Sequence, residues 1–169
     1  MTGQPELIEK TDRGRRRAAG IYGAVVTAAV IAAAGEQLRT RLLVVTVVVT
    51  LLVYWIAEQY AGLLGEHTAA GHLPTWSQIR VGLASSWPMV GASYAPLLAL
   101  ILARFAGASA LTAANIGLAA ALVLLVYHGW SAGRAAHLQG KTLLAATSVA
   151  AALGVVMILL KDLVLIHLH

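Results

Sequence analysis

Hydrophobic residues fill five long stretches of the chain, and all of the charged side chains lie before, between or after these stretches. The stretches without any charged residue run over 18–35, 42–57, 81–103, 105–133 and 142–160. A helix needs about 20 apolar residues to cross the hydrocarbon core of a bilayer, and a charge at its end can reach the interface. The pattern predicts five transmembrane helices, near 18–37, 42–64, 87–107, 111–131 and 142–165.

The overall composition agrees with a membrane protein. Of the 169 residues, 59% are hydrophobic and only 11% are charged, whereas a soluble domain carries about 25% charged residues. These values exclude a disordered chain and a soluble nucleic-acid-binding domain. The absence of cysteine excludes disulfides, thiolate metal ligands and thiol redox chemistry. We therefore predict an all-α, polytopic membrane helix bundle whose main partner is the lipid bilayer and which binds no nucleic acid.

The distribution of basic residues predicts the orientation in the membrane. Residues 1–17 hold five Lys or Arg, and we expect them to form a basic cytoplasmic arm before a single five-helix transmembrane domain at 18–169. With the N-terminus inside, eight Lys or Arg lie on the cytoplasmic side and four lie on the outer side. Cytoplasmic loops carry the excess of these residues. We expect a multi-pass protein of the cell membrane with a cytoplasmic N-terminus and an outer C-terminus.

A short additional helix is predicted before the third span. Thr75 and Gln78 have the T-x-x-Q spacing of a capping box, which marks a helix start. One face of this helix then carries the apolar residues Trp76, Ile79, Leu83 and Trp87. Such a face favours a helix that lies in the cytoplasmic membrane interface, and the alternative is a short turn facing water. Further along, Pro96 predicts a kink in the third span.

Small residues at helical spacing predict where the helices touch one another. The first span carries Gly20, Ala24, Ala28 and Ala32 at steps of four. The fourth span carries Ala113, Gly117 and Ala121, and the fifth carries Ala146, Ala150 and Gly154. Because helices in lipid associate through close backbone approach, we expect these stripes to serve packing.

The second span carries the strongest candidate for function. Thr46, Thr50, Tyr54 and Glu58 recur at steps of four, so they share one face of the helix. A carboxylate within an apolar span is costly unless it is paired, protonated or hydrated, and it therefore indicates a functional site. The alternative is that Glu58 reaches the cytoplasmic interface or makes a structural hydrogen bond.

His128 in the fourth span is expected at nearly the same depth as Glu58, because both spans run inward. A Glu–His pair can hold and pass a proton, or supply two ligands to a divalent cation. We predict that the two side chains lie within direct or one-water reach, and that Tyr54 and Thr50 line the same cation or proton pathway. Further ligands could come from the adjoining loop, whose residues Glu66, His67 and His72 could also be simply solvated.

A second group of charged residues is expected near the outer ends of the spans. Its members Glu36, Arg104 and Asp162 are predicted to form one or two ion pairs there. The alternative is an outer gate or an anion-attracting vestibule.

The sequence holds no motif of a known enzyme class. There is no P-loop, G-x-S-x-G, H-E-x-x-H, EF-hand or dinucleotide fingerprint, and we expect neither an enzyme nor a bound cofactor. We instead expect a transporter or channel for a proton or divalent cation. It would form a homo-oligomer, because five spans enclose little interior. The alternative function is a non-transporting membrane scaffold or accessory subunit.

Two segments resemble the vacuolar iron transporter family. The segment Ala57-Glu58-Gln59-Tyr60, followed by Glu66, resembles the family's second helix, and 121–161 resembles its last two helices. The resemblance implies a five-span fold with the N-terminus inside, and for Glu58 a role in cation binding. The family's first helix carries an Asn-Asp-Gly signature, whereas Tyr22-Gly23-Ala24 here has no carboxylate. The family's long acidic cytoplasmic helices are also absent, so the resemblance implies the fold more than iron transport.

Overall fold

All the regular structure in the described part of the chain is helical. The computed structural model describes residues 4–35, 37–70, 75–136 and 138–167, which form seven helices. They are α1 (Gln4–Ala34), α2 (Thr40–Ala70), α3 (Trp76–Ser86), α4 (Pro88–Gly91), α5 (Tyr94–Phe105), α6 (Ala110–Ala135) and α7 (Gly140–His167). The predicted all-α class is confirmed for these residues.

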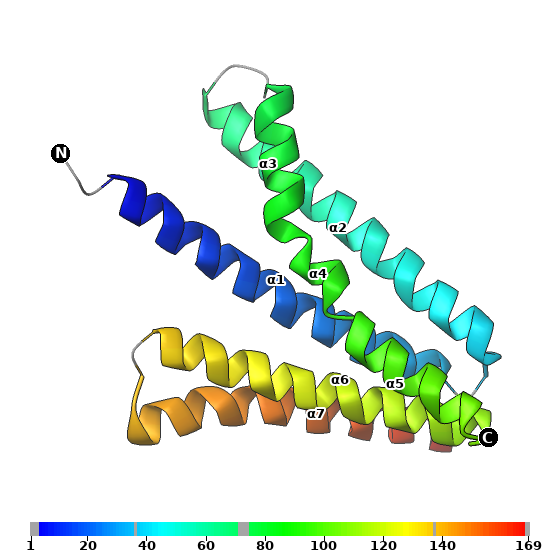
Figure 1. Ribbon diagram of the computed structural model, residues 1–169. Helices are drawn as coiled ribbons and strands as arrows, with labels where there is room; N and C mark the ends of the chain where they lie inside the picture. Colours follow the sequence, from blue (N-terminus) through cyan, green and yellow to red (C-terminus); the bar gives the residue numbers. More distant parts are fainter. Residues whose placement is uncertain (1–3, 36, 71–74, 137, 168–169) are drawn as a thin grey trace.

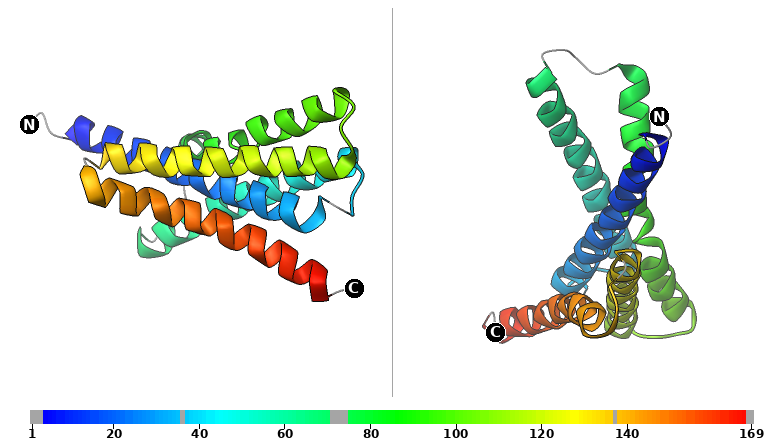
Figure 2. Two further views of the ribbon diagram at one scale, coloured as in Figure 1. Left: turned by 90° about the horizontal axis from the view of Figure 1, so that it is seen from below. Right: turned by 90° about the vertical axis from the view of Figure 1, so that its left-hand side faces the viewer.

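Helix α1 lies at the centre of the bundle. Figure 1 shows α2 and α3 on one side of α1 and the pair α6 and α7 on the other. The second view in Figure 2 shows the same separation from the side, with α2 and α6 diverging at their C-terminal ends. Helix α1 contacts α2, α3, α4, α6 and α7. Helix α1 therefore joins the two halves of the molecule, together with the contact of α5 with α6.

Four helical stretches are long and apolar enough to cross a membrane, judged by length and composition. They are Arg13–Ala34, Thr40–Gly65, Trp76–Phe105 and Ala110–Ala135. These four stretches support a membrane protein. The fifth predicted span corresponds to α7, in which the described residues include the apolar stretch Gly140–Val156. The structure thus supports four of the five expected spans.

The third apolar stretch is broken into α3, α4 and α5. Pro88 begins α4, and Pro96 lies in the first turn of α5. A proline lacks an N–H group and crowds the carbonyl four residues earlier, so each one disturbs the turn before it. Ser93 lies between α4 and α5, where its N–H and its hydroxyl both donate to the carbonyl of Val90, at 3.1 and 2.8 Å. The kink expected at Pro96 is thus a break one turn earlier, and the break at Pro88 falls where the short helix was expected to meet the third span.

Helix α3 begins at the predicted capping box and is a separate short helix before the third span, as expected. The N–H of Thr75 donates to Oε1 of Gln78 at 2.8 Å, and the N–H of Gln78 donates to Oγ1 of Thr75 at 3.4 Å. The buried residues of α3 are Ser85 and Ser86, whereas Trp76 is 71% exposed. Helix α3 also begins the apolar stretch Trp76–Phe105 and packs against α1 and α2. Its place in the membrane interface stays a prediction.

The small-residue stripe of α1 forms the closest helix contacts. Ala24 and Ala28 are fully buried, and Gly20 and Ala32 are also buried. Gly23, beside this stripe, lies so close to α4 that a Cβ atom there would be 2.0 Å from the carbonyl oxygen of Met89. The packing role predicted for the stripe is confirmed.

The stripes of the fourth and fifth predicted spans are also used. In α6, Ala113, Gly117 and Ala121 are buried, and a Cβ on Gly117 would lie 3.0 Å from the Cβ of Leu100 in α5. In α7, Ala150 and Gly154 are buried, and the side chain of Ala146 lies outside the described residues. Close backbone approach therefore joins α5 to α6, as lipid-embedded helices require.

Candidate functional site

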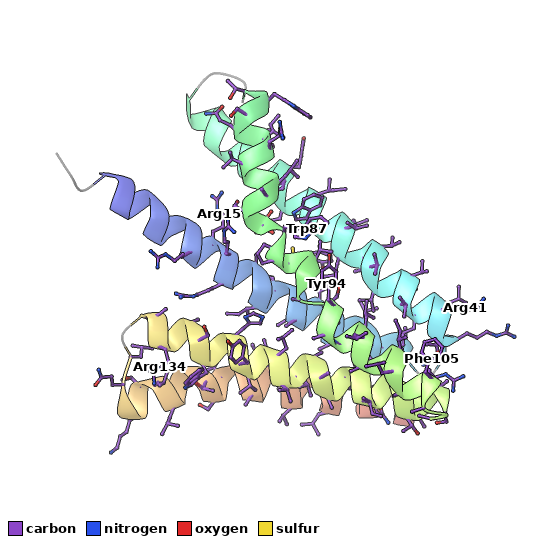
Figure 3. The ribbon with its side chains drawn as sticks, in the orientation of Figure 1. Arg15, Arg41, Trp87, Tyr94, Phe105 and Arg134 are labelled. Atoms are coloured by element: carbon purple, nitrogen blue, oxygen red, sulfur yellow. The ribbon has the colours of Figure 1, made fainter. Side chains whose placement is uncertain are left out.

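A polar cavity of about 420 Å³ opens between α1, α2 and α3. Its polar lining comes from Arg15 of α1, Glu58 and Gln59 of α2, and Ser77, Gln78 and Ser85 of α3. Figure 3 shows Arg15 on the side of α1 that faces α3. The cavity therefore brings a carboxylate and a guanidinium together with neutral hydroxyl and amide groups, inside stretches that are otherwise apolar.

A hydrogen-bonded cluster behind the cavity fixes α2 against α3. The buried hydroxyl oxygen of Ser86 accepts hydrogen bonds from Nε1 of Trp55 at 3.0 Å and from Nε2 of Gln59 at 2.6 Å. The Trp55 ring also packs edge-to-face on Trp87, with 5.2 Å between the ring centroids. The amide N–H of Gln59 is used in this hydrogen bond, and its Oε1 atom, an acceptor, lies close to Gly82. These contacts hold the segment of α2 that carries Glu58, the residue before Gln59.

Ser86→Ala is expected to lower the free energy of unfolding by about 1–2 kcal/mol, because two donors would lose their acceptor. Ser77→Ala, an exposed position on the same helix, is the matched control and should change stability little. Thermal unfolding of the purified variants in detergent measures the difference. Equal melting temperatures for the two variants would contradict the structural role of the cluster.

Two further buried hydroxyls lie between α1 and the broken span. Thr27 and Ser93 are fully buried, and Thr27 donates to the carbonyl of Gly23 at 2.7 Å. Helices α1 and α3–α5 run in the same direction (Figure 1) and touch where Gly23 meets Met89. Thr27 and Ser93 each follow this contact by four residues, which is one turn of helix. They therefore lie at a similar level on the two helices.

Sequence reasoning singled out none of the buried serines. Ser85, Ser86 and Ser93 stand in an apolar stretch that also contains Pro88 and Pro96. Hydroxyl residues close to helix-breaking prolines in a membrane span are the signal that could have found them, because such residues satisfy the freed backbone groups.

The residues of α2 predicted to line one pathway are not brought together in the cavity. Glu58 is exposed and lines the cavity. Tyr54 is 52% exposed and Thr50 is half-buried, and neither lines this cavity. The buried face of α2 is the neighbouring stripe Leu43, Val47 and Leu51. Of the predicted group, the structure brings only Glu58 into the cavity, and it adds Arg15.

His128 packs against α1 and does not line the cavity that Glu58 lines. The imidazole is half-buried and packs on Gly20 of α1, where an added Cβ would lie 3.1 Å from its Cε1 atom. The ring also contacts Tyr127, with 5.8 Å between the centroids. Helices α2 and α6 diverge on opposite sides of α1 (Figures 1 and 2). In the part of the chain that is described, no contact joins His128 to Glu58.

The other predicted charged groups lie largely outside the described residues. This holds for Glu36 and for the side chains of Glu66, His67, His72 and Asp162. Arg104 is exposed, and its guanidinium donates to the carbonyl of Ala108 in the tight connection between α5 and α6. Within the described residues, no three His, Asp or Glu side chains are grouped so that they could hold a metal ion.

No family model, curated protein or solved structure matches this chain. The chemistry of the cavity therefore carries the functional argument. Glu58 can accept and release a proton or attract a cation, and the nearby serine hydroxyls and glutamine amides can hydrogen-bond to water or to an ion's hydration shell. Arg15 places an opposite charge in the same cavity, which lowers the cost of keeping a carboxylate there.

Proposed function

We propose that the chain is a small membrane transporter or channel that moves a proton or a divalent cation past Glu58. The observation that carries the proposal is a carboxylate on the apolar stretch Thr40–Gly65 that lines a polar cavity of about 420 Å³. A water molecule takes about 30 Å³ in the liquid, so this volume holds several waters beside the carboxylate. A hydrated carboxylate within a span is typical of ion and proton pathways.

The buried hydroxyls support a polar route that continues beyond the cavity. Ser86 lies behind the cavity lining, and Thr27 and Ser93 lie farther along α1 and the broken span. Pro88 and Pro96 leave carbonyl groups in that span without their usual helical donors. Interrupted helices with such carbonyls form the ion and substrate sites of many transporters.

The proposal is tested by measuring flux through the purified protein in liposomes. Liposomes would contain either a pH-sensitive dye or a dye sensitive to divalent cations, and a gradient of the corresponding ion would be imposed across the membrane. We expect flux of one of these ions above that of protein-free liposomes. Flux indistinguishable from protein-free liposomes for both ions would refute the proposal.

Three expectations from the sequence remain predictions. They are the cytoplasmic N-terminus, the homo-oligomer and the resemblance to the vacuolar iron transporter family. Because the chain has no cysteine, a single cysteine introduced at Gly14 can be labelled from one side of the membrane to test the orientation. Light scattering of the purified protein tests the oligomer, and iron flux in the same liposomes tests the relation to iron transport.

A further inference from the structure

We propose that the groove between α6 and α7 binds a phospholipid with a net negative headgroup. The phosphate would lie beside Arg134 at the connection of the two helices, and an acyl chain would follow the groove toward Gly154. This site lies on the opposite side of α1 from the Glu58 cavity (Figure 1), and the inference does not depend on the proposed transport function.

The headgroup end is a polar cavity with one basic side chain, that of Arg134, in its lining. It measures about 360 Å³ and is lined by Arg134 of α6 together with Leu138, Gln139, Gly140 and Leu143. The guanidinium of Arg134 is held over the Trp130 ring, 5.3 Å from its centroid. Lys141 is exposed next to Gly140, and none of the lining residues is acidic. An arginine with a lysine nearby and a neutral amide is the chemistry that binds a phosphate group.

The acyl end is an apolar cavity between the same two helices. It measures about 340 Å³, and its lining residues are all aliphatic or glycine. They include Val123 and Val126 of α6 and Ala151 and Gly154 of α7. In the left view of Figure 2, α6 and α7 lie together at their connection and separate along α7. A hydrocarbon chain is the ligand that fits such a lining in a membrane-spanning helix pair.

The two cavities lie on the same face of α6. Val123, Val126, Trp130 and Arg134 follow one another at steps of three or four residues, which keeps them on one side of the helix. On α7, Leu143 and Ala150 are seven residues apart and share a side in the same way. The headgroup cavity and the apolar cavity therefore follow one another along the same side of the α6–α7 pair, and the helices approach each other closely between them at Gly129 and Ala150.

The length of the groove suits a lipid in one leaflet. Val126 and Leu122 precede Arg134 by eight and twelve residues, or about 12 and 18 Å along the helix. One leaflet contributes about 15 Å of hydrocarbon. A phosphate at Arg134 therefore allows an acyl chain from the same molecule to reach the apolar cavity. Trp130 and the exposed Tyr127 are the residue types that lie at the level of lipid headgroups.

The headgroup part is tested by comparing how much phosphatidylglycerol and how much phosphatidylcholine the protein retains. The full chain would be purified in detergent with equal amounts of both lipids, and bound lipid would be counted by native mass spectrometry. We expect phosphatidylglycerol to be retained about fivefold more than phosphatidylcholine, because one basic residue at the surface contributes an effect of that size. Arg134→Gln should remove most of this preference. Arg80→Gln, which removes the same charge from an exposed site on α3, should leave it unchanged.

The acyl part is tested by filling the groove. Ala151 lines the apolar cavity and Ala152 does not, and both side chains are exposed. Ala151→Phe should reduce lipid retention severalfold, while Ala152→Phe should not. Soluble glycerol phosphate, which has the phosphate but no acyl chain, should not displace the lipid. Equal retention of the two lipids by the wild type, equal effects within either pair of variants, or displacement by glycerol phosphate would overturn the inference.

Discussion

Gly23→Ala is expected to destabilise the folded protein by about 2 kcal/mol or more, because overpacking a tight contact costs roughly 1–3 kcal/mol and sometimes more. The new methyl group would lie 2.0 Å from the carbonyl oxygen of Met89 and 2.9 Å from the Cβ of Ala92. Both are rigid parts of the neighbouring segment, so α1 and α4 would have to move apart. The gain in helix propensity from glycine to alanine, about 1 kcal/mol, is too small to offset that separation.

Gly14→Ala provides the matched control on the same helix. Gly14 is exposed, and nothing lies within 4 Å of a Cβ atom added there. Its alanine variant should therefore be as stable as the wild type or slightly more stable. Thermal unfolding of both variants in detergent, followed by circular dichroism, measures the contrast. If the Gly23→Ala and Gly14→Ala variants have the same melting temperature, α1 and α4 are not in close contact.

The contact surfaces of α1 could be predicted from the sequence, but their partners could not. Small residues at steps of four identify the face of a helix that approaches another backbone, and Ala24 and Ala28 are fully buried as expected. The neighbour of Gly23 is a carbonyl group of α4. That helix exists only because two prolines break the third span, and the register of one helix against another depends on the whole bundle.

Helix α3 shows that the apolar face of a membrane protein's helix need not point to the protein core. In a soluble protein an apolar face points to the core, but in a membrane the surroundings are as apolar as the core. The residues of α3 that face the protein are Ser85 and Ser86, which are buried, while Trp76 points outward. Polar and small residues hold helices together in lipid because hydrogen bonds and close approach are the interactions that distinguish protein from lipid there.

Only part of the candidate site could be predicted from the sequence. The reason is geometric. Counting residues from the end of a span gives the depth of a side chain, and this identified Glu58 as a carboxylate within an apolar span. Depth alone does not give the direction in which a side chain points around the bundle. His128 was chosen by depth, yet its ring packs on Gly20 of α1. Arg15, assigned to the basic arm, also lines the cavity with Glu58.

Glu58→Gln is expected to reduce ion flux in liposomes at least tenfold, to near the level of protein-free liposomes. Glutamine keeps the size and the hydrogen-bonding capacity of the side chain, but it can neither carry a negative charge nor take up a proton. Because the side chain is exposed in the cavity, the substitution should leave folding unchanged. A normal elution volume and melting temperature would establish that the variant is intact. A loss of flux would then report on the carboxylate itself.

Two further variants separate the charge of Glu58 from its shape and from its surroundings. Glu58→Asp keeps a carboxylate on a shorter side chain and should retain a measurable part of the flux, since the proton or cation still finds a negative group in the cavity. Tyr54→Phe, one helical turn earlier and outside the cavity lining, should behave as the wild type. If Glu58→Gln conducts as well as Glu58→Asp, the carboxylate is not on the pathway. If Tyr54→Phe abolishes flux while Glu58→Gln does not, the pathway follows the exposed stripe of α2 instead of the cavity.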